Sequence, residues 1–396
     1  SQLMSTNFKE TLIKECKNLF YDDKFEQKLD SNLKLIGFEN GIYDLDKNIF
    51  REGRPDDYIT MSTNNNYYKW TDKNPIFKQI LKFFEQVFPN ENVRKYFLTV
   101  LSTCVSGETK EEKLYMLTGS GSNGKSLTND LMSKSLGDYY MSCDISLITR
   151  KRGQSNQAAP EKVRMKGRRC GIFQEADEDE KMNVGLVKEM TGGDIMLMRD
   201  LFKGSDEMIE IKPQMKYFLT ANKLPDVPST DDGTWRRLRV IQFISKFVKN
   251  PTKQHEFMID TNLKQKIDDW ANVFASYLIH LYITVYKNTE YLIEPPEVMS
   301  STDGYKLTND YFTEYFSEKI RVTTDSKNTI NKNSLWEDFR QWYRNSYDYK
   351  SIPKRTDFIL FMTKRVGEPN SKGYTNIVFV NDSDSESDNE ECTASC

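Results

Sequence analysis

Between residues 113 and 243, short runs of apolar residues alternate with longer polar or amphipathic stretches. Short apolar runs are typical of buried strands, whereas apolar positions that recur every three or four residues indicate helices. Strands that alternate with helices form a parallel sheet covered by helices, so the pattern predicts an α/β fold. The predicted strands cover 113–119, 168–175, 214–220 and 237–243, and the predicted helix after the first strand runs from Ser126 to about Leu136.

Helical spacing also marks the segments on both sides of this region. Asn74 followed by Pro75 is a favourable helix start, and apolar residues keep helical spacing as far as Val87. A second helix is predicted after Pro89 and a long one over 253–287. Each has one apolar stripe, which indicates packing rather than ligand binding.

Beyond about residue 305 the pattern predicts a small α+β domain. Ser334, three residues before Glu337, has the capping-box spacing at the start of a helix. A second helix is predicted to end near Arg365, and 373–380 is predicted as a strand. Helix, helix and strand hairpin form the outline of a winged helix.

The segment Gly-Ser-Gly-Ser-Asn-Gly-Lys-Ser matches the phosphate-loop pattern Gly-x-x-x-x-Gly-Lys-Ser/Thr. Backbone N–H groups of such a loop, with the N-terminus of the following helix, bind phosphate oxygens. Lys125 would contact the β- and γ-phosphates, and the Ser126 hydroxyl would join the ligands of Mg²⁺. A predicted strand precedes the motif and a predicted helix follows it, as the motif requires, so we favour a nucleotide site over a chance match. The loop comprises Gly119, Ser120, Gly121, Ser122, Asn123, Gly124, Lys125 and Ser126.

Two further residues follow predicted strands. Ligands of parallel sheets bind at the carboxyl ends of the strands, so Glu175 would face the phosphates and polarise the attacking water or hold Mg²⁺. Its alternative is an ordinary acid in an acid-rich loop. Asn222 would orient the water beside the γ-phosphate, although an Asn after a strand is more often a turn former.

Arg236 and Arg237 directly precede the last predicted strand. An Arg that reaches the nucleotide of a neighbouring subunit would stabilise the transition state as an arginine finger. Neighbouring residues on a strand point in opposite directions, so at most one of the two is the finger. The alternative is a solvated basic pair.

Between the two predicted strands that end near Glu175 and Asn222 lies Thr191-Gly-Gly-Asp, followed by Arg199 and Lys203. The glycines permit a tight turn, and the basic side chains would touch a phosphodiester backbone. A polar hairpin without a nucleic-acid role is as good a reading of this spacing.

In sequence order these features resemble superfamily 3 helicases, specifically the poxvirus-type and phage-type primase–helicases of large DNA viruses. The features are the phosphate loop, a strand ending in Glu, Lys188-x-x-Thr-Gly-Gly-Asp, a strand ending in Asn, and Trp-Arg-Arg. Upstream, Gly41-Ile-Tyr-Asp-Leu and Asp57-Tyr-Ile-Thr are similar to the short domain that precedes the ATPase in this group. The resemblance is specific over 113–243 and looser over 35–110 and 253–300.

The resemblance implies an AAA+ ATPase that assembles as a hexameric ring. It implies that Lys125 and Ser126 bind ATP and Mg²⁺, that Glu175 is the catalytic acid, and that Asn222 is the sensor. It also implies that Arg236 or Arg237 is the finger supplied in trans and that Arg199–Lys203 belongs to a hairpin entering the DNA channel. One departure is Gln174, since family members often have two adjacent acids there, which makes Asp177 the second candidate acid.

The function expected from the resemblance is an ATP-dependent DNA helicase in viral DNA replication, as the helicase part of a primase–helicase. The alternatives are a P-loop DNA-translocating or initiator ATPase that does not separate strands, and a nucleotide-binding switch. Expected partners are single-stranded DNA in a central channel, further copies of the chain in a homohexamer, a primase domain, and DNA polymerase or processivity factors. The expected location is the host-cell interior, in the cytoplasm or at a viral replication site.

Composition changes this picture little. The net charge is −3, but the six acids after Asn381 carry no compensating base, and without them the net charge becomes +3, which permits a nucleic-acid channel. Six scattered cysteines lack metal-ligand spacing, and no apolar run is long enough for a membrane span. The expected organisation is an N-terminal domain (1–72), a helical collar-like segment (73–110), the P-loop core (111–250), a helical segment (251–304), the C-terminal domain (305–380) and a disordered acidic tail (381–396).

Overall fold

The computed structural model describes residues 5–22, 24–150, 160–174, 181–199, 208–227, 231–289, 291–325, 327–347 and 352–380, so the expected disordered tail lies outside the described residues. The described residues form two compact units, one within 5–227 and 231–302 and one within 303–380. Among the described residues, none of the helices combines the length and the apolar character that a bilayer crossing requires.

A five-stranded sheet forms the centre of the first unit, with the strand order β10-β4-β9-β6-β5. All neighbouring strands in it are parallel, which confirms the α/β fold and each predicted strand. The sequence pattern missed β5, a short edge strand in which exposed Ser142 interrupts the apolar run. The strands are β4 (Leu114–Thr118), β5 (Tyr140–Cys143), β6 (Cys170–Gln174), β9 (Lys216–Ala221) and β10 (Leu238–Gln242).

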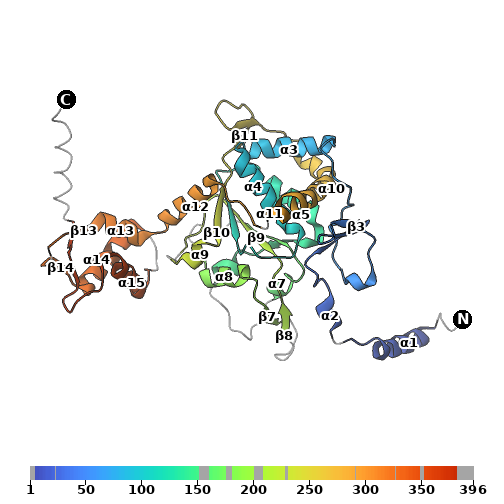
Figure 1. Cartoon of the computed structure of the whole chain (residues 1–396), viewed down its shortest axis with the longest axis horizontal. Helices are drawn as coiled ribbons and strands as arrows, with labels where there is room; N and C mark the ends of the chain where they lie inside the picture. The colour runs from blue at the N-terminus through green and yellow to red at the C-terminus, as the bar shows by residue number, and fades with distance from the viewer. Residues whose placement is uncertain are drawn as a thin grey trace. The chain divides into compact units, whose positions relative to one another are not determined.

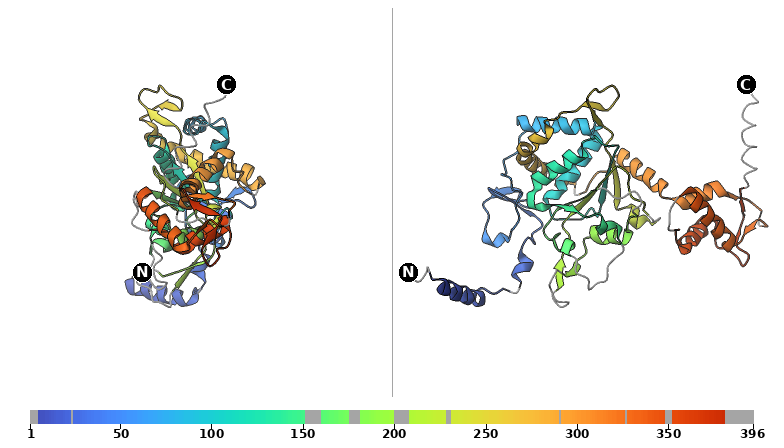
Figure 2. Two further views of the ribbon diagram at one scale, coloured as in Figure 1. Left: turned by 90° about the vertical axis from the view of Figure 1, so that its left-hand side faces the viewer. Right: turned by 180° about the vertical axis from the view of Figure 1, so that it is seen from behind.

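Four of the predicted helices gather on one side of this sheet, and α8 lies on the other side (Figures 1 and 2). The predicted start at Asn74 is confirmed, because its side chain accepts hydrogen bonds from the N–H groups of Ile76 and Phe77. The helices are α3 (Pro75–Val87), α4 (Glu91–Ser102), α5 (Lys125–Leu136), α10 (Leu263–Leu281) and α8 (Val184–Thr191).

The prediction of one long helix over 253–287 is wrong for residues 253–262, because helix α10 begins only at Leu263. Strands β11 (Lys246–Val248) and β12 (Glu256–Met258) form a parallel pair there. The backbone N–H groups of Thr252 and Lys253 donate to the Glu256 carboxylate at 2.9 and 3.1 Å, and His255 takes a left-handed conformation with φ of 65°. These local bonds close a turn that competes with a helix.

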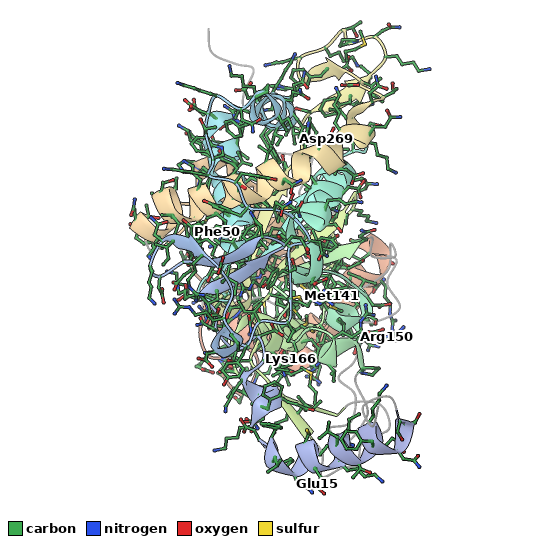
Figure 3. The ribbon with its side chains drawn as sticks, turned by 90° about the vertical axis from the view of Figure 1, so that its right-hand side faces the viewer. Glu15, Phe50, Met141, Arg150, Lys166 and Asp269 are labelled. Atoms are coloured by element: carbon green, nitrogen blue, oxygen red, sulfur yellow. The ribbon has the colours of Figure 1, made fainter. Side chains whose placement is uncertain are left out.

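Residues near the N-terminus share a core with the central sheet. Strands β1 (Leu35–Phe38), β2 (Gly41–Asp44) and β3 (Ile49–Arg51) form an antiparallel sheet. Phe50, labelled in Figure 3, packs its ring 4.7 Å from that of Tyr67. The buried Ile36 and Leu45 belong to the same apolar cluster as α3, α4 and α10.

Short elements complete the first unit. Helix α1 (Thr6–Leu19) has no buried residue, although the structure describes all of it. The others are α2 (Phe25–Lys28), η2 (Pro55–Asp57), η3 (Thr103–Val105), η4 (Gly137–Tyr139), α6 (Ser146–Thr149), α7 (Pro160–Val163), β7 (Met196–Arg199), β8 (Met208–Ile211), α9 (Asp232–Trp235), the π-helical η5 (Tyr282–Tyr286) and α11 (Lys287–Thr289). Helix α12 (Pro296–Thr308) begins in the first unit and ends in the second.

The second unit has an apolar core of its own, in which Phe339 and Phe358 are fully buried. Its α+β class is as predicted, but the strands 374–375 and 377–379 pair with earlier strands of this unit and not with each other, so the described residues do not form the strand hairpin of the winged-helix outline. The first predicted helix also begins earlier than expected. Asn331 caps that helix by accepting from the N–H of Asn333 at 2.8 Å, so Ser334 lies inside it and is not the cap. The elements are α13 (Tyr311–Lys319), β13 (Ile320–Val322), β14 (Thr329–Ile330), α14 (Lys332–Ser346), α15 (Arg355–Val366), β15 (Tyr374–Thr375) and β16 (Ile377–Phe379).

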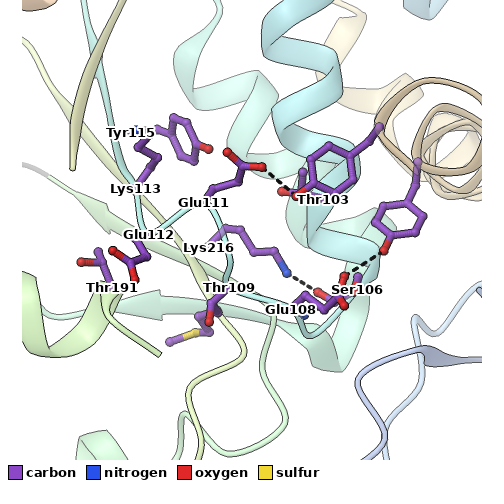
Figure 4. A pocket seen from close by; sticks show the side chains of 13 residues that line it. Thr103, Ser106, Glu108, Thr109, Glu111, Glu112, Lys113, Tyr115, Thr191 and Lys216 are labelled. Carbon is purple, nitrogen blue, oxygen red and sulfur yellow. Dashed lines mark hydrogen bonds between the residues drawn. The ribbon is translucent and has the colours of Figure 1, made fainter. Parts of the chain in front are cut away.

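A buried cation lies at the amino end of the central sheet. Lys216, which is 6% exposed, donates to the carbonyl oxygen of Ser106, and Figure 4 shows its ammonium group directed at that residue. A second acceptor is the carbonyl oxygen of Gln214 at 3.4 Å. Burial lowers the pKa of Lys216 to about 7, because the protonated form loses its hydration.

This pKa makes stability depend on pH. In the unfolded chain Lys216 keeps its proton to about pH 10, so between the two pKa values the unfolded state binds more protons and stability rises with pH. The substitution Lys216→Met removes this contribution. Between about pH 6 and pH 9 the melting temperature of Lys216→Met should therefore rise less than that of the parent. The control is Lys82→Met, which replaces an exposed lysine and should show the same pH dependence of the melting temperature as the parent. If the melting temperatures of Lys216→Met and the parent change equally with pH, the prediction is contradicted.

Candidate nucleotide-binding site

The predicted phosphate loop connects β4 to α5 and needs its glycines. Gly124, the residue before α5, has φ of 90°, and a Cβ there would lie 2.7 Å from the Val87 side chain. A Cβ on Gly119 would lie 2.6 Å from the carbonyl oxygen of Phe243. The loop therefore lies directly on α3 and β10, with no room for side chains at these positions.

Lys125 and Asn222 meet at the carboxyl ends of neighbouring strands. The Lys125 ammonium group, 6% exposed as a residue, donates to the carbonyl oxygen of Gly119 at 2.7 Å and to Oδ1 of Asn222 at 3.1 Å. The hydroxyl of Thr118 donates to the backbone carbonyl of Asn222 at 3.1 Å. The register explains the meeting, because Thr118 of β4 pairs with Ala221 of β9. A cation and a neutral amide thus lie together beside the loop.

The loop fits an anionic ligand. The buried Nδ2 donor of Asn123 lacks a hydrogen-bond partner within the described part of the chain. Both Asn123 and the exposed Ser126 line a pocket of about 370 Å³. Among the described residues, no three His, Cys, Asp or Glu side chains form a metal-binding group. The residues predicted to hold Mg²⁺ are Ser126, which lines this pocket, and Glu175, which lies outside the described residues, and both would act together with the phosphates of the ligand.

Several predicted residues fall outside the described residues. Strand β6 ends at Gln174, which pairs with Thr220, two residues before Asn222. Glu175, Asp177 and Lys203 themselves are not described.

The hairpin expected after Thr191 is present. Strands β7 and β8 pair antiparallel, and the side chain of Arg199, at the end of β7, lies outside the described residues.

The two arginines lie at the opposite edge of the sheet. Arg236 and Arg237 precede β10, whose first residue pairs with Leu114, and the phosphate loop begins beyond Thr118, about 13 Å further along the strand. The Arg237 side chain is 12% exposed and donates to Glu112 at 3.0 Å. It also donates to the carbonyl oxygen of Gly233 at 2.8 Å. The Arg236 side chain is 58% exposed and pairs with Glu112 at 2.8 Å. Neither guanidinium group is beside its own phosphate loop.

Sequence reasoning missed two parts of this arrangement. Glu112 lies in a mixed run of charges that has no distinguishing spacing. Phe247, Ile259 and Leu263 also line the pocket. No motif marks them, and two of them lie near the residues wrongly predicted as helix.

Comparison with known sequences shows which proteins this chain is similar to. Residues 1–86 match the family described as D5 N terminal like. The chain is 41% identical over 375 residues to a proposed helicase, L207/L206, of Acanthamoeba polyphaga mimivirus, covering 92% of this chain and 38% of that protein. It is 30% identical to the proposed helicase 184R of Invertebrate iridescent virus 6, covering 91% of this chain and 40% of the relative.

A proposed primase, C962R, of African swine fever virus is 27% identical, and the match covers 88% of this chain and 37% of that protein. The chain thus spans about two fifths of the length of these relatives. The solved C-terminal region of NrS-1 aligns with a TM-score of 0.47 at 14% identity, covering 89% of this chain and 83% of that one.

Proposed function

Since the chain belongs to the D5-type primase–helicase family of large DNA viruses, we propose that it is an ATP-dependent DNA helicase of the superfamily 3 type. It acts in viral DNA replication as the helicase portion of a primase–helicase. The observation that carries the proposal is the contact of Lys125 with Asn222 beside a glycine loop at the start of α5. A phosphate loop with a neutral amide at its open end suits hydrolysis of a terminal phosphate.

Each residue has a distinct role in this proposal. The loop N–H groups bind the triphosphate, and Lys125 compensates the charge that develops on the transferred phosphoryl group. Asn222 and Glu175 hold and polarise the attacking water. Bound Mg²⁺ would neutralise phosphate charge, with Ser126 and Glu175 as its protein ligands.

The proposal includes a hexameric AAA+ ring. Arg236 and Arg237 are held at the edge of the sheet opposite their own loop. A finger drawn from this pair would act on the nucleotide of a neighbouring copy. Arg236 is the better candidate, because its side chain is mostly exposed and that of Arg237 is nearly buried.

A fork-unwinding assay tests the function. The chain is incubated with ATP, Mg²⁺ and a forked duplex that has single-stranded arms, and its assembly is sized in parallel. Strand separation that requires ATP, by a particle of several copies, is the expected result. Hydrolysis stimulated by DNA without strand separation would identify a translocating or initiator ATPase. Slow hydrolysis that is indifferent to DNA would identify a nucleotide switch.

The substitution Glu175→Gln separates binding from turnover. The amide keeps the shape of the side chain but cannot accept a proton, so ATP binding should persist while turnover falls about a hundred-fold. Asp177→Asn is the matched variant and should retain most activity. Turnover near the parent rate in Glu175→Gln, with a loss in Asp177→Asn, would transfer the role to Asp177.

A further inference from the structure

The pocket beside the phosphate loop has a second wall, in which apolar Phe247, Ile259 and Leu263 are accompanied by polar residues, namely Asp260, Thr261 and Lys264. Phe247 and Leu263 are partly buried and pack against the main core, while Ile259 is 43% exposed. All three line the same pocket of about 370 Å³ as the loop. Phe83, almost fully buried, lies behind Gly124 and lines the pocket too. Apolar side chains left open in a pocket indicate a ligand surface.

The wall is attached to the loop itself. The backbone N–H of Phe247 donates to the carbonyl oxygen of Ser122 at 2.7 Å, which fixes β11 against the middle of the loop. The backbone N–H of Ile259 donates to the carbonyl oxygen of Val248 at 3.0 Å, and that of Leu263 donates to the carbonyl oxygen of Asp260 at 3.3 Å. The wall therefore offers side-chain surfaces rather than backbone donors.

The two ends of the pocket differ in chemistry. At one end Lys125 and Asn222 provide the cation and the amide beside which a terminal phosphate would lie. Phe247 lines the same pocket as Lys125, and its backbone bond to Ser122 holds it beside the loop, so a nucleotide whose terminal phosphate lies at Lys125 can reach the Phe247 ring. The part of a nucleotide farthest from its terminal phosphate is a flat aromatic base, whose faces are apolar and stack on aromatic rings.

We propose that Phe247, supported by Leu263 and Ile259, is the stacking surface for the nucleobase, and that β11, β12 and the start of α10 form the base-binding half of the nucleotide site. This proposal rests on the proposed function, because it assumes that the loop binds a nucleoside triphosphate. It adds residues that contact the base, whereas every residue assigned above contacts phosphate or water.

Calorimetric titration with two ligands tests it. ATP and inorganic tripolyphosphate, each with Mg²⁺, are titrated into the parent, Phe247→Ala, Phe247→Tyr and Phe257→Ala. Phe257 lies across the β11–β12 pair, with its ring 6.1 Å from that of Phe247, and it does not line the pocket. Phe247→Ala should bind ATP about ten-fold more weakly, as loss of one base–aromatic stack predicts, and tripolyphosphate as the parent does. Phe247→Tyr, which keeps the ring, should bind ATP like the parent, and so should Phe257→Ala.

The outcomes separate the two proposals. Unchanged ATP affinity in Phe247→Ala would overturn the base-stacking role and leave the phosphate loop assigned. An equal loss of ATP affinity in Phe257→Ala would also overturn it, because the loss would then reflect disruption of the strand pair. If the parent binds neither ligand, the loop is not a triphosphate site and both proposals fail.

Discussion

The substitution Lys125→Ala should abolish ATP hydrolysis and leave the fold intact. It removes the ammonium group that would meet the transferred phosphoryl, together with its contacts to Gly119 and Asn222 at 2.7 and 3.1 Å. The lost hydrogen bonds cost about 1 kcal/mol each, which a domain of this size tolerates. Phosphate release measures the effect, and a melting curve verifies the fold.

Lys134→Ala is the matched control for that experiment. Lys134 lies on the same helix, its side chain is 60% exposed, and it pairs with Asp268 at 2.9 Å. The control should hydrolyse ATP like the parent, since surface ion pairs contribute little to stability. Hydrolysis that persists in Lys125→Ala would remove the loop from the catalytic site.

Arg236→Ala should lower turnover by about three orders of magnitude and leave ATP binding by each subunit unchanged. In the proposed ring, the finger acts on a neighbour's nucleotide, where it stabilises charge in the transition state only. Arg237→Ala should instead lower the melting temperature, because it leaves the carbonyl oxygen of Gly233 and the carboxylate of Glu112 short of a nearly buried partner. Single-turnover kinetics and melting curves of the two variants distinguish these roles.

Mixing subunits tests whether the finger acts in trans. An Arg236→Ala subunit keeps a working phosphate loop, and a Lys125→Ala subunit keeps a working finger. In a mixed ring the second can complete the site of the first, so ATPase activity should recover although each variant alone is inactive. Sizing verifies that the two variants co-assemble. A co-assembled mixture that stays inactive would contradict a finger supplied in trans.

The sequence was informative where local pattern and tertiary position agree. The strands before the phosphate loop and before Asn222 are continuous apolar runs, as expected for strands buried on both faces. Parallel pairing then brings their carboxyl ends to one edge, so the closeness of Lys125 and Asn222 could be anticipated without coordinates. The helix start at Asn74 could also be predicted from the sequence, since its capping hydrogen bonds involve only residues two and three positions away.

The sequence was uninformative where the outcome depends on distant neighbours. Arg236 and Arg237 are adjacent and chemically identical, and only the contacts of Arg237 with Gly233 and Glu112 bury one of them. Residues 253–262 carry helix-compatible composition, but the bonds from the Glu256 carboxylate close a turn instead. Phe247 is brought to the pocket by tertiary contacts, among them the bond of its backbone N–H to Ser122 of the phosphate loop, which no local pattern indicates.

The close contact of Gly124 with Val87 ties the nucleotide site to a helix that ends well upstream of the motif. Ile80, Phe84 and Val87 of α3, and Phe274 of α10, are fully buried in one cluster with the strands of the central sheet. Each such side chain contributes about 1.5–3 kcal/mol through burial. A fragment cut at the limits of the recognisable motifs, 111–250, would open this cluster to water on two sides. The stretch that carries the chemistry is therefore smaller than the stretch that can fold, and a fragment that is to keep the nucleotide site has to include α3 and α10.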